Sequence, residues 1–337
     1  MINRILIVGY GSIGKRHLCL ARELFPHADI RVMRHKECSS VPEKADGCFF
    51  LIEQAIHFLP QIAIIANPAS HHLKVAIPLA EQGVHLFIEK PLSASCDGVM
   101  QLIEVCREKK TILLTGYNLR FLKSLEKYRE LLQERLIGRV ISVRCEIGQY
   151  LPSWRPESDY RQGVSALRSM GGGALLELSH EIDYIRWIFG DVDWVRAILS
   201  KQSSLEIDVE DTCHLIIGFM QGDDGYQLIG SLNIDFVRHD TTRLCTAIGE
   251  YGSLRWNGLT GVIEKFEMGS EKWIEVYHYP HQRNDSYIAE WKHFIDCVQG
   301  KEVPLITGED GLKVLQIIDA ARKSSECGEQ VQINHQY

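Results

Sequence analysis

The chain has 337 residues, of which 45% are hydrophobic and 24% are charged, and its formal net charge is -7 with a pI near 6.1. This composition is ordinary for a globular protein, and the length favours two domains. No block of Lys or Arg stands out and no apolar run approaches the roughly 18 residues that cross a bilayer, so we expect neither nucleic-acid nor membrane partners.

The ten cysteines carry no Cys-x-x-Cys spacing, and most of them lie within apolar runs. We interpret them as small core residues of a protein in a reducing cytoplasm, and we expect no metal site. The first apolar strand is entered by Ile2, so no signal peptide is expected before it.

A glycine-rich turn follows the first apolar run. Residues 5–8 predict a buried parallel strand, and residues 15–23 continue with helical spacing. Between them lies a Gly-x-Gly-x-x-Gly sequence, whose glycines permit a tight turn, close approach to a pyrophosphate and close helix packing. The start of the helix favours an anion. We therefore predict dinucleotide binding at Gly9, Gly11, Ser12, Ile13 and Gly14, although a plain glycine turn without a ligand is the alternative.

The second strand is predicted over residues 29–33 and ends at Arg34. An acidic residue in this region would bind the ribose hydroxyls of NAD, whereas Arg34 would suit the 2′-phosphate of NADP. The sequence therefore favours NADP(H). The alternative is that Arg34 is a solvated loop residue and that NAD binds without the acid.

Apolar strands then alternate with helices as far as residue 115. Strands are predicted over 62–66, 84–88 and 111–115, with helices over 73–82 and 97–109. This alternation predicts a parallel, doubly wound sheet whose ligands bind beyond the carboxyl ends of the strands. Residues 67–68, 89–91 and 116–118 all follow such ends, and we expect them on one rim with Gly11.

The pattern changes near residue 121. The sequence predicts a helix over 122–134, an antiparallel strand over 140–149, a polar and aromatic loop over 150–170, and a helix over 174–189. Strands are then predicted over 195–201, 212–219, 227–236, 243–249, 253–256, 262–268 and 273–279, with closing helices over 287–299 and 309–325. The fold class is thus α/β followed by α+β, with an open, mostly antiparallel second sheet that helices cover on one face. The expected domains are 1–120 and 121–337, and the helix 309–325 could pack back on the first domain.

Lys90 is the sharpest candidate for chemistry. It follows a buried strand on the predicted ligand rim and precedes Pro91. A lysine amine beside a nicotinamide can take the proton of an alcohol as hydride leaves. The alternative is a surface lysine at the end of a strand.

The helix that follows three consecutive glycines carries a second candidate group. Glu177, His180, Glu181 and Tyr184 fall on one polar stripe, at i, i+3, i+4 and i+7. Glycines at the start of this helix suggest close approach of another group, and His180 titrates near neutral pH. We predict His180 and Glu177 in the active site, although a charged stripe is also typical of a solvated face.

The loop before that helix could hold a substrate. Its arginines can clamp an anion while its aromatic rings stack on a sugar face, which suits a uronic acid or a nucleotide sugar. The alternative, a lid held by its own ion pairs, is nearly as well supported. The residues concerned are Trp154, Arg155, Tyr160 and Arg161.

These motifs in this order resemble the Gfo/Idh/MocA oxidoreductases: residues 9–14, 67–72, 89–91, 116–121 and 171–183. The resemblance implies a Rossmann domain and a sheet domain whose outer face makes homodimers or homotetramers. It implies Lys90 as the catalytic lysine of the Glu-Lys-Pro motif. The expected cofactor contacts are Asn67, Pro68, His72, Glu89, Lys90 and Asn118, and Arg120 is counted with the substrate residues.

The chain departs from the family pattern in two places. The site helix carries Glu177 three residues before His180, where most members carry Asp four residues before, and Arg34 replaces the usual acid. The expected activity is an NAD(P)-dependent dehydrogenase or reductase of a sugar or nucleotide sugar. A redox-neutral enzyme that passes through a transient ketone, and a catalytically dead cofactor sensor, remain open at this point.

Overall fold

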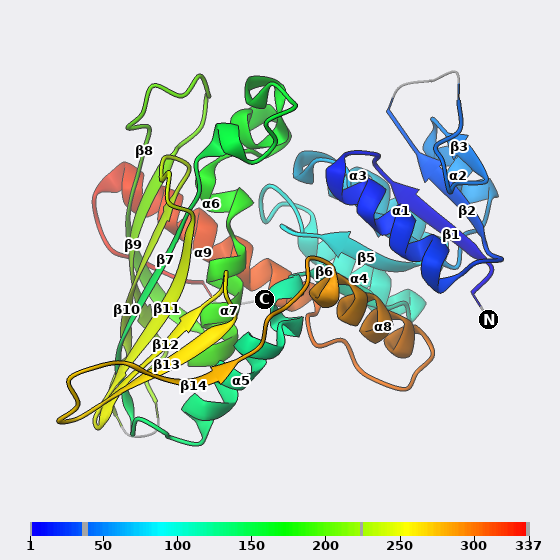
Figure 1. Ribbon diagram of the computed structural model, residues 1–337. Helices are drawn as coiled ribbons and strands as arrows, with labels where there is room; N and C mark the ends of the chain where they lie inside the picture. The colour runs from blue at the N-terminus through cyan, green and yellow to red at the C-terminus, as the bar shows by residue number, and fades with distance from the viewer. Residues whose placement is uncertain (1, 36–39, 223–224, 335–337) are drawn as a thin grey trace. The chain divides into compact units, whose positions relative to one another are not determined.

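The computed structural model describes residues 2–35, 40–222 and 225–334, which form two compact units (Figure 1). The first unit contains the residues up to 117 together with 288–315, and the second contains 118–287 together with the residues from 316 onward. This division differs from two contiguous domains, because residues 288–315 belong to the first unit rather than to the second.

The first unit contains a six-stranded parallel sheet in the order β3-β2-β1-β4-β5-β6 (Figure 1). Its central strands are continuous apolar runs with almost no exposed surface, as expected when helices cover both faces of a parallel sheet. The expected doubly wound fold is therefore confirmed. The strands are β1 (Arg4–Val8), β2 (Asp29–Met33), β3 (Gly47–Phe49), β4 (Ile62–Ile65), β5 (His85–Glu89) and β6 (Leu113–Gly116). The helices are α1 (Ser12–Leu24), α2 (Ile52–His57), α3 (His72–Glu81) and α4 (Val99–Lys109).

Two late segments of the chain complete the core of the first unit. From α8 (Asp285–Val298), the Trp291 and Phe294 rings pack on Phe87 of β5, with centroid separations of 6.2 and 5.7 Å. From α9 (Gly308–Cys327), Gly308 and Gly311 lie so close to Leu113 and Leu92 that added Cβ atoms would overlap these side chains. Burial of these large apolar side chains assigns residues 288–315 to this unit.

The second unit contains a nine-stranded sheet in the order β14-β13-β12-β11-β7-β10-β9-β8-β15 (Figure 1). Its neighbouring strands are antiparallel except for β7 and β10, which run parallel, so the sheet is mixed but mostly antiparallel, as expected. The strands are β7 (Val140–Gly148), β8 (Val192–Ser200), β9 (Thr212–Phe219), β10 (Ile229–Asp235), β11 (Thr242–Gly249), β12 (Gly252–Asn257), β13 (Val262–Glu267), β14 (Ile274–His278) and β15 (Val331–Gln332).

Helices cover one face of this sheet. α5 (Lys123–Gln133) packs on β12, β13 and β14, and α6 (Ala174–Glu177) packs on β9 and β10, while α7 (His180–Phe189) lies on the same side (Figure 1). Side chains along the strands alternate between this covered face and an uncovered one. The uncovered face carries exposed isoleucines, among them Ile198 and Ile216.

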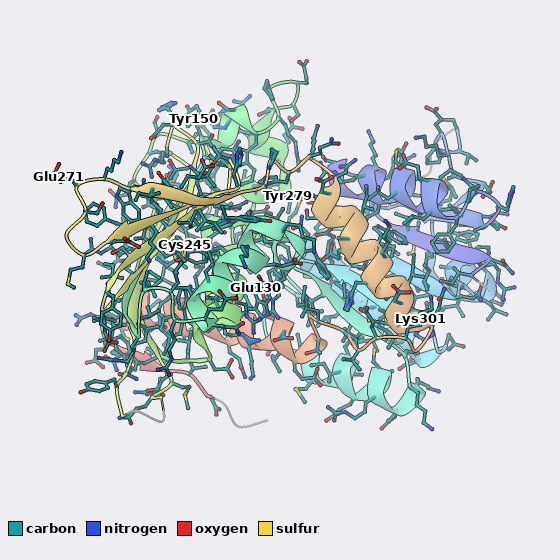
Figure 2. The ribbon with its side chains drawn as sticks, turned by 60° about the horizontal axis from the view of Figure 1, so that its bottom comes forward. Glu130, Tyr150, Cys245, Glu271, Tyr279 and Lys301 are labelled. Carbon is teal, nitrogen blue, oxygen red and sulfur yellow. The ribbon has the colours of Figure 1, made fainter. Side chains whose placement is uncertain are left out.

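Cys145 and Cys245 lie directly opposite each other on β7 and β11, with their buried sulfur atoms 3.0 Å apart in a thiol hydrogen bond. Figure 2 shows Cys245 among the side chains of the sheet, while Glu271 lies at the outer end of the β13–β14 hairpin. Burial raises the pKa of the Cys145 thiol, which therefore stays protonated. The nine described cysteines are all free thiols.

Three short elements lie outside the sequence prediction: β3, α2 and β15. β15 pairs with only two residues of β8 at the edge of the second sheet. Further along β8, the hydroxyls of Ser324 and Ser325 accept the main-chain N–H groups of Ala197 and Leu199, at 2.9 and 2.8 Å. The helix α9 thus provides hydrogen-bond acceptors for main-chain N–H groups of β8 that do not pair with β15. None of the helices in the described ranges is both long and apolar enough for a transmembrane span.

Candidate active site

The strand ends of the first unit place the predicted cofactor residues along one edge of the sheet. The register pairs Val8 with Met33 and with Ile65, Ile65 with Ile88, and Glu89 with Gly116. The carboxyl ends of these strands therefore lie at the same edge, where ligands of such sheets bind. Gly9, Arg34 and Lys90 follow their strands directly, and Asn67 follows β4 after Ala66.

The turn after β1 has the geometry of a phosphate-binding loop. Gly9 has a φ of +93°, and a Cβ there would lie 2.6 Å from the carbonyl oxygen of Ala66, so only glycine fits. Gly14 packs equally closely on the Gly9 carbonyl. Gly11, in contrast, is exposed and faces open space, which leaves room for a bulky group at the start of α1.

The start of α1 also suits a negative charge. No side chain caps its N-terminus at Gly11, and its first turn carries no acidic residue. The N–H groups of this turn, among them those of Ser12 and Ile13, and the helix dipole favour an anion there. The chemistry of this turn therefore fits the pyrophosphate of a dinucleotide.

Basic groups flank the same turn. The Arg34 guanidinium lies 5.0 Å from the centre of the Tyr10 ring, and the Lys15 amine lies 5.2 Å from it. Such cation–π contacts hold both charged groups beside the glycine turn. Two basic side chains therefore lie beside the turn near the end of β2.

Asn67 follows β4 at the predicted ligand edge, before Pro68. Its side-chain oxygen Oδ1 is buried and has no hydrogen-bond partner among the described residues, and the same holds for the hydroxyl of Ser70. Buried polar atoms in native proteins normally have partners. These orphaned atoms are consistent with a polar ligand at this edge.

Lys90 lies at the carboxyl end of β5 and is half-buried. Glu89 before it is buried, and its carboxylate oxygen Oε1 lies 2.7 Å from Nε2 of His17, while Oε2 accepts the main-chain N–H of Lys90 at 3.2 Å. His17 is itself fully buried, and its Nδ1 accepts a hydrogen bond of 2.9 Å from the indole N–H of Trp291. Glu89 thus has protein partners for both oxygens, and its predicted direct contact with the cofactor is not supported.

The sequence analysis did not assign a role to His17 or Trp291. Trp291 lies 274 residues after His17, and no local spacing connects the two. The only local signal was a histidine three residues after the last glycine of the turn.

His72 was expected at the ligand rim, but the structure places it in the interior, 1% exposed. Its Nε2 lies 2.8 Å from the carbonyl oxygen of Asn67, and its Nδ1 lies 3.3 Å from the carbonyl oxygen of Leu92. Burial lowers its pKa below the ordinary value near 6.5. A neutral imidazole has one N–H and can donate to only one of these carbonyl oxygens, and the contact with Asn67 is the shorter. The side chain therefore lies buried between two loops at the rim.

The predicted site helix of the second unit is interrupted. α6 ends at Glu177 and α7 begins at His180, with Leu178 and Ser179 between them. The spacing of one continuous helix therefore does not apply across Glu177 and His180, and the expected polar stripe was wrong. Both residues are half-buried. The glycines before α6 approach the protein itself, because a Cβ on Gly173 would overlap the Glu210 carboxylate.

The other members of that stripe are interior residues. Glu181 is fully buried, and its Oε1 accepts a hydrogen bond of 2.7 Å from Nε of Arg243. Tyr184 is also fully buried, and its ring meets Trp256 at 5.4 Å in an edge-on arrangement. These two side chains stabilise the interior of the second unit, so the solvated-face interpretation does not apply to them.

Arg120 was predicted to contact the substrate, but it is 2% exposed. Its guanidinium binds the Asp183 carboxylate with two hydrogen bonds, of 2.9 and 2.6 Å, and lies 5.7 Å from the Trp187 ring. Asn118, before it, donates from Nδ2 to the hydroxyl of Ser286 at 2.8 Å. The Arg120 guanidinium is held by Asp183, which does not support the predicted substrate contact.

The loop over 150–170 is built from short 3-10 turns, and several of its predicted substrate residues bind within the protein. Arg161 pairs with Asp159 at 2.8 Å and with Glu206 at 3.1 Å, and the Tyr160 hydroxyl accepts the N–H of Glu206. These contacts match the alternative of a lid held by its own ion pairs.

Trp154 and Arg155 of this loop differ in whether other residues of the protein bind their side chains. The Trp154 indole donates to the carbonyl of Gln149 at 3.1 Å and packs edge-on against Phe236. Arg155 is exposed, and the structure of the described ranges gives its side chain no hydrogen bond or ion pair. Arg155 therefore remains available to a ligand.

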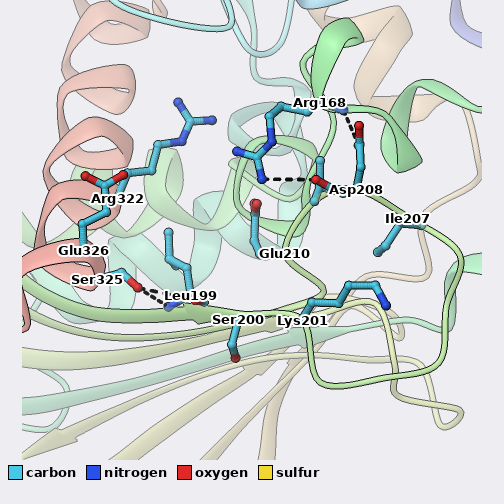
Figure 3. A pocket seen from close by; sticks show the side chains of 11 residues that line it. Arg168, Leu199, Ser200, Lys201, Ile207, Asp208, Glu210, Arg322, Ser325 and Glu326 are labelled. Carbon is cyan, nitrogen blue, oxygen red and sulfur yellow. Dashed lines mark hydrogen bonds between the residues drawn. The ribbon is translucent and has the colours of Figure 1, made fainter.

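A cavity of about 530 Å³ lies in the second unit near this loop (Figure 3). Arg168, Lys201 and Arg322 line it together with Asp208, Glu210 and Glu326, so the formal charges of its wall balance. Figure 3 shows Arg168 bonded to Asp208, from its main-chain N–H to the carboxylate and from its guanidinium to the carbonyl oxygen. None of the predicted site residues lines this cavity. Within the described residues no group of three or more His, Cys, Asp or Glu could hold a metal ion.

Two family models match the chain. The model described as "Oxidoreductase family, NAD-binding Rossmann fold" matches residues 3–117, and "Oxidoreductase family, C-terminal alpha/beta domain" matches residues 129–333. The chain therefore belongs to the Gfo/Idh/MocA oxidoreductases, and the resemblance carried by its motifs is confirmed. Its first unit carries the family's NAD-binding domain.

Characterised relatives match over nearly the whole chain. Myo-inositol 2-dehydrogenase of Thermotoga maritima is 26% identical over 96% of this chain and 96% of its own length. Levoglucosan dehydrogenase in complex with NADH has a TM-score of 0.84 at 20% identity, over 98% of this chain and 99% of that chain. The WlbA dehydrogenase of Bordetella pertussis, in complex with NADH and UDP-GlcNAcA, has a TM-score of 0.81 at 20% identity, over 100% of both chains. The chain is thus an oxidoreductase, as expected.

Proposed function

We propose that this oxidoreductase is a dehydrogenase of a sugar or nucleotide-linked sugar, with Lys90 as its acid/base. The supporting observation is that Lys90 leaves β5 at the same sheet edge as the glycine turn and the orphaned oxygen of Asn67. The names of the relatives favour sugar-like substrates, since they include an inositol and a levoglucosan dehydrogenase.

In the proposed reaction a hydroxyl group of the substrate becomes a ketone. A bound nicotinamide coenzyme would supply the acceptor for the hydride that leaves the carbon bearing the hydroxyl. The Lys90 amine takes the hydroxyl proton, and in the reverse direction the lysine ammonium returns it to the ketone oxygen. The turn over residues 9–14 would bind the pyrophosphate, and Asn67 would bind a polar group of the ligand.

From the second unit we assign His180 as a partner acid/base or as a residue that orients the substrate. It is half-buried at the first position of α7, and a histidine ring can both accept and donate a proton. Glu177, at the last position of α6, is the second residue proposed there. Arg155 is the substrate-loop residue whose side chain the structure leaves available.

We further propose that the cofactor is NADP(H). Arg34 and Lys15 beside Tyr10 supply positive charge where a 2′-phosphate would lie. The matched structures contain NADH, so the proposal departs from those relatives. Comparing the affinities for NADPH and NADH in the wild type and in Arg34→Ala tests it. We expect a wild-type preference for NADPH that the substitution removes, whereas a preference for NADH that the substitution leaves unchanged would exclude this role.

We propose that the uncovered face of the second sheet forms a homodimer or homotetramer. Ile198, Ile216 and Ile229 on this face expose 65%, 45% and 45% of their surface, which is unusual for side chains of this size on neighbouring strands. Light scattering of the wild type and of Ile198→Lys/Ile216→Lys tests it. We expect an oligomer that the double substitution dissociates, and a monomeric wild type would contradict the proposal.

The decisive test of the enzymatic proposal is a screen with both coenzymes against inositols, anhydrosugars and UDP-sugars, followed by the absorbance of the reduced nicotinamide. With the substrate found, Lys90→Ala should bind the coenzyme as the wild type does and lose about 10²–10⁴-fold in turnover. Unchanged turnover would refute the role of Lys90. Coenzyme that copurifies and is never released would instead favour the redox-neutral alternative.

A further inference from the structure

A buried histidine lies on each side of the main chain at Lys90, and the one before it is bonded to the residue that accepts the Lys90 N–H. Before it, Glu89 accepts the Lys90 N–H at 3.2 Å and is itself bound by His17 at 2.7 Å. After it, the carbonyl oxygen of Leu92 lies 3.3 Å from His72. Both imidazoles are almost completely buried. A neutral imidazole has one N–H, and the shorter contact of His72 is with Asn67, so the hydrogen bonds that fix the Lys90 main chain are those of Glu89.

The hydrogen atoms on the His17 ring follow from the chemistry of its partners. An indole N–H can only donate, so Nδ1 of His17, 2.9 Å from Trp291, must accept and carries no hydrogen in this arrangement. The hydrogen of the neutral ring therefore lies on Nε2, which donates to the Glu89 carboxylate. The three hydrogen bonds have a defined direction: Trp291 donates to His17, His17 donates to Glu89, and the Lys90 N–H donates to Glu89 from the other side.

We propose that His17, oriented by Trp291, is a positioning residue that acts through Glu89 to fix the main chain at Lys90. This inference rests on the proposed function only in giving Lys90 a catalytic role. The hydrogen-bond arrangement itself makes predictions for the protein without cofactor or substrate.

Glu89→Gln is the most direct test, because the arrangement needs an acceptor at both side-chain oxygen positions. An amide offers one oxygen and one N–H₂ group, so the substituted side chain can accept from His17 or from the Lys90 N–H but not from both. We expect the variant to keep the bond to the buried imidazole and to lose the bond to Lys90. Hydrogen exchange of the Lys90 amide should then become about tenfold faster, as expected for loss of a bond to a charged group.

Trp291→Phe removes the indole donor and frees His17 to move its hydrogen to Nδ1. With its hydrogen on Nδ1, His17 can accept a hydrogen bond at Nε2 from the N–H₂ group that Glu89→Gln introduces. The oxygen of that glutamine side chain is then free to accept the main-chain N–H of Lys90. The double variant Trp291→Phe/Glu89→Gln should therefore exchange its Lys90 amide more slowly than Glu89→Gln alone. If the two substitutions instead change the exchange rate of the Lys90 amide independently, so that their factors multiply in the double variant, the proposed direction of the hydrogen bonds is overturned.

Two measurements on cofactor-free protein follow these changes. Exchange is read by mass spectrometry on peptides that span residues 88–92, in which Pro91 has no amide hydrogen. The ¹⁵N shifts of labelled histidine report the tautomer of His17 directly. We expect the Nε2–H form in the wild type and in Glu89→Gln, and a share of the Nδ1–H form in the double variant. An Nδ1–H ring in the wild type would overturn the proposal, and this test requires no substituted protein to fold.

His85→Gln is the matched control, since His85 lies at the other end of the same strand and accepts the N–H of Ile112 at 3.0 Å. We expect it to leave the Lys90 amide and the kinetic constants unchanged. With a substrate in hand, Glu89→Gln should lower kcat at least tenfold with little change in the KM for coenzyme, whereas a purely structural role would lower stability alone. If Lys90→Ala retains full turnover, the proposed function fails, while the exchange results still decide whether His17 and Glu89 hold the Lys90 main chain.

Discussion

The two units hold their buried carboxylates in different ways. In the first unit, Glu89 lies 2.7 Å from the His17 imidazole and accepts the main-chain N–H of Lys90. In the second unit, Asp183 and Glu181 are bound by the guanidinium groups of Arg120 and Arg243. A guanidinium places a full positive charge beside the carboxylate, whereas a main-chain N–H offers only a neutral hydrogen-bond donor. The difference distinguishes the buried ion pairs in the core of the second unit from the hydrogen-bonded carboxylate beside Lys90, for which we propose a positioning role.

The largest expected effect comes from breaking a neutralised pair. Asp183→Asn or Arg120→Met alone should lower the free energy of unfolding by about 3–5 kcal/mol, because each leaves its partner buried without a counter-charge. Urea unfolding of each variant and of the wild type measures this loss of free energy. Arg120→Met/Asp183→Leu should cost less than the sum of the two single losses, and simple additivity would show that the pair is not coupled.

A smaller effect is expected from the buried histidines of the first unit. Burial lowers the pKa of His72 and of His85 below the ordinary value near 6.5, so the unfolded chain binds protons more readily than the folded one in that range. Stability should therefore be fully present above about pH 6.5 and fall as the pH decreases toward the lowered values. Thermal unfolding between pH 7.5 and 5.5 measures it, and in His72→Gln this slope should be shallower. An unchanged slope would remove His72 from the explanation.

The smallest effect is expected at the exposed ion pairs of the loop over residues 150–170. Arg161 binds Asp159 and Glu206 with its side chain half exposed, and both pairs are accessible to solvent and salt. Arg161→Ala should leave the melting temperature nearly unchanged. If it also lowers the affinity for a substrate from the screen, the loop binds ligand, and if it does not, the loop is held only by its own ion pairs.

The sequence was most informative where function and fold depend on local pattern. The strands β2 and β9 have the predicted bounds, because continuous or alternating apolar runs between turns define them. The glycine turn was predictable for the same reason, since the Gly-x-Gly-x-x-Gly spacing between an apolar strand and a helix is itself a local pattern.

Prediction failed where distant segments decide the outcome. The polar stripe of Glu177, His180, Glu181 and Tyr184 was counted on one helix, but the break at residues 178–179 and the pairing with Arg243 are tertiary features. The partner of His17 lies in α8, far along the chain, and the burial of Arg120 depends on Asp183. Periodicity within one window contains no information about such partners.

The assignment of residues 288–315 to the first unit has a consequence for dissecting the protein. A fragment that ends at residue 120 would contain every strand of the parallel sheet but would lack Trp291 and Phe294, and so would expose the ring of Phe87 to water. It would also deprive His17 of its indole donor. We expect such a fragment to be aggregation-prone when produced alone and to be rescued by a peptide spanning 288–315. Gene fusions and domain exchanges between relatives should therefore transfer both pieces together.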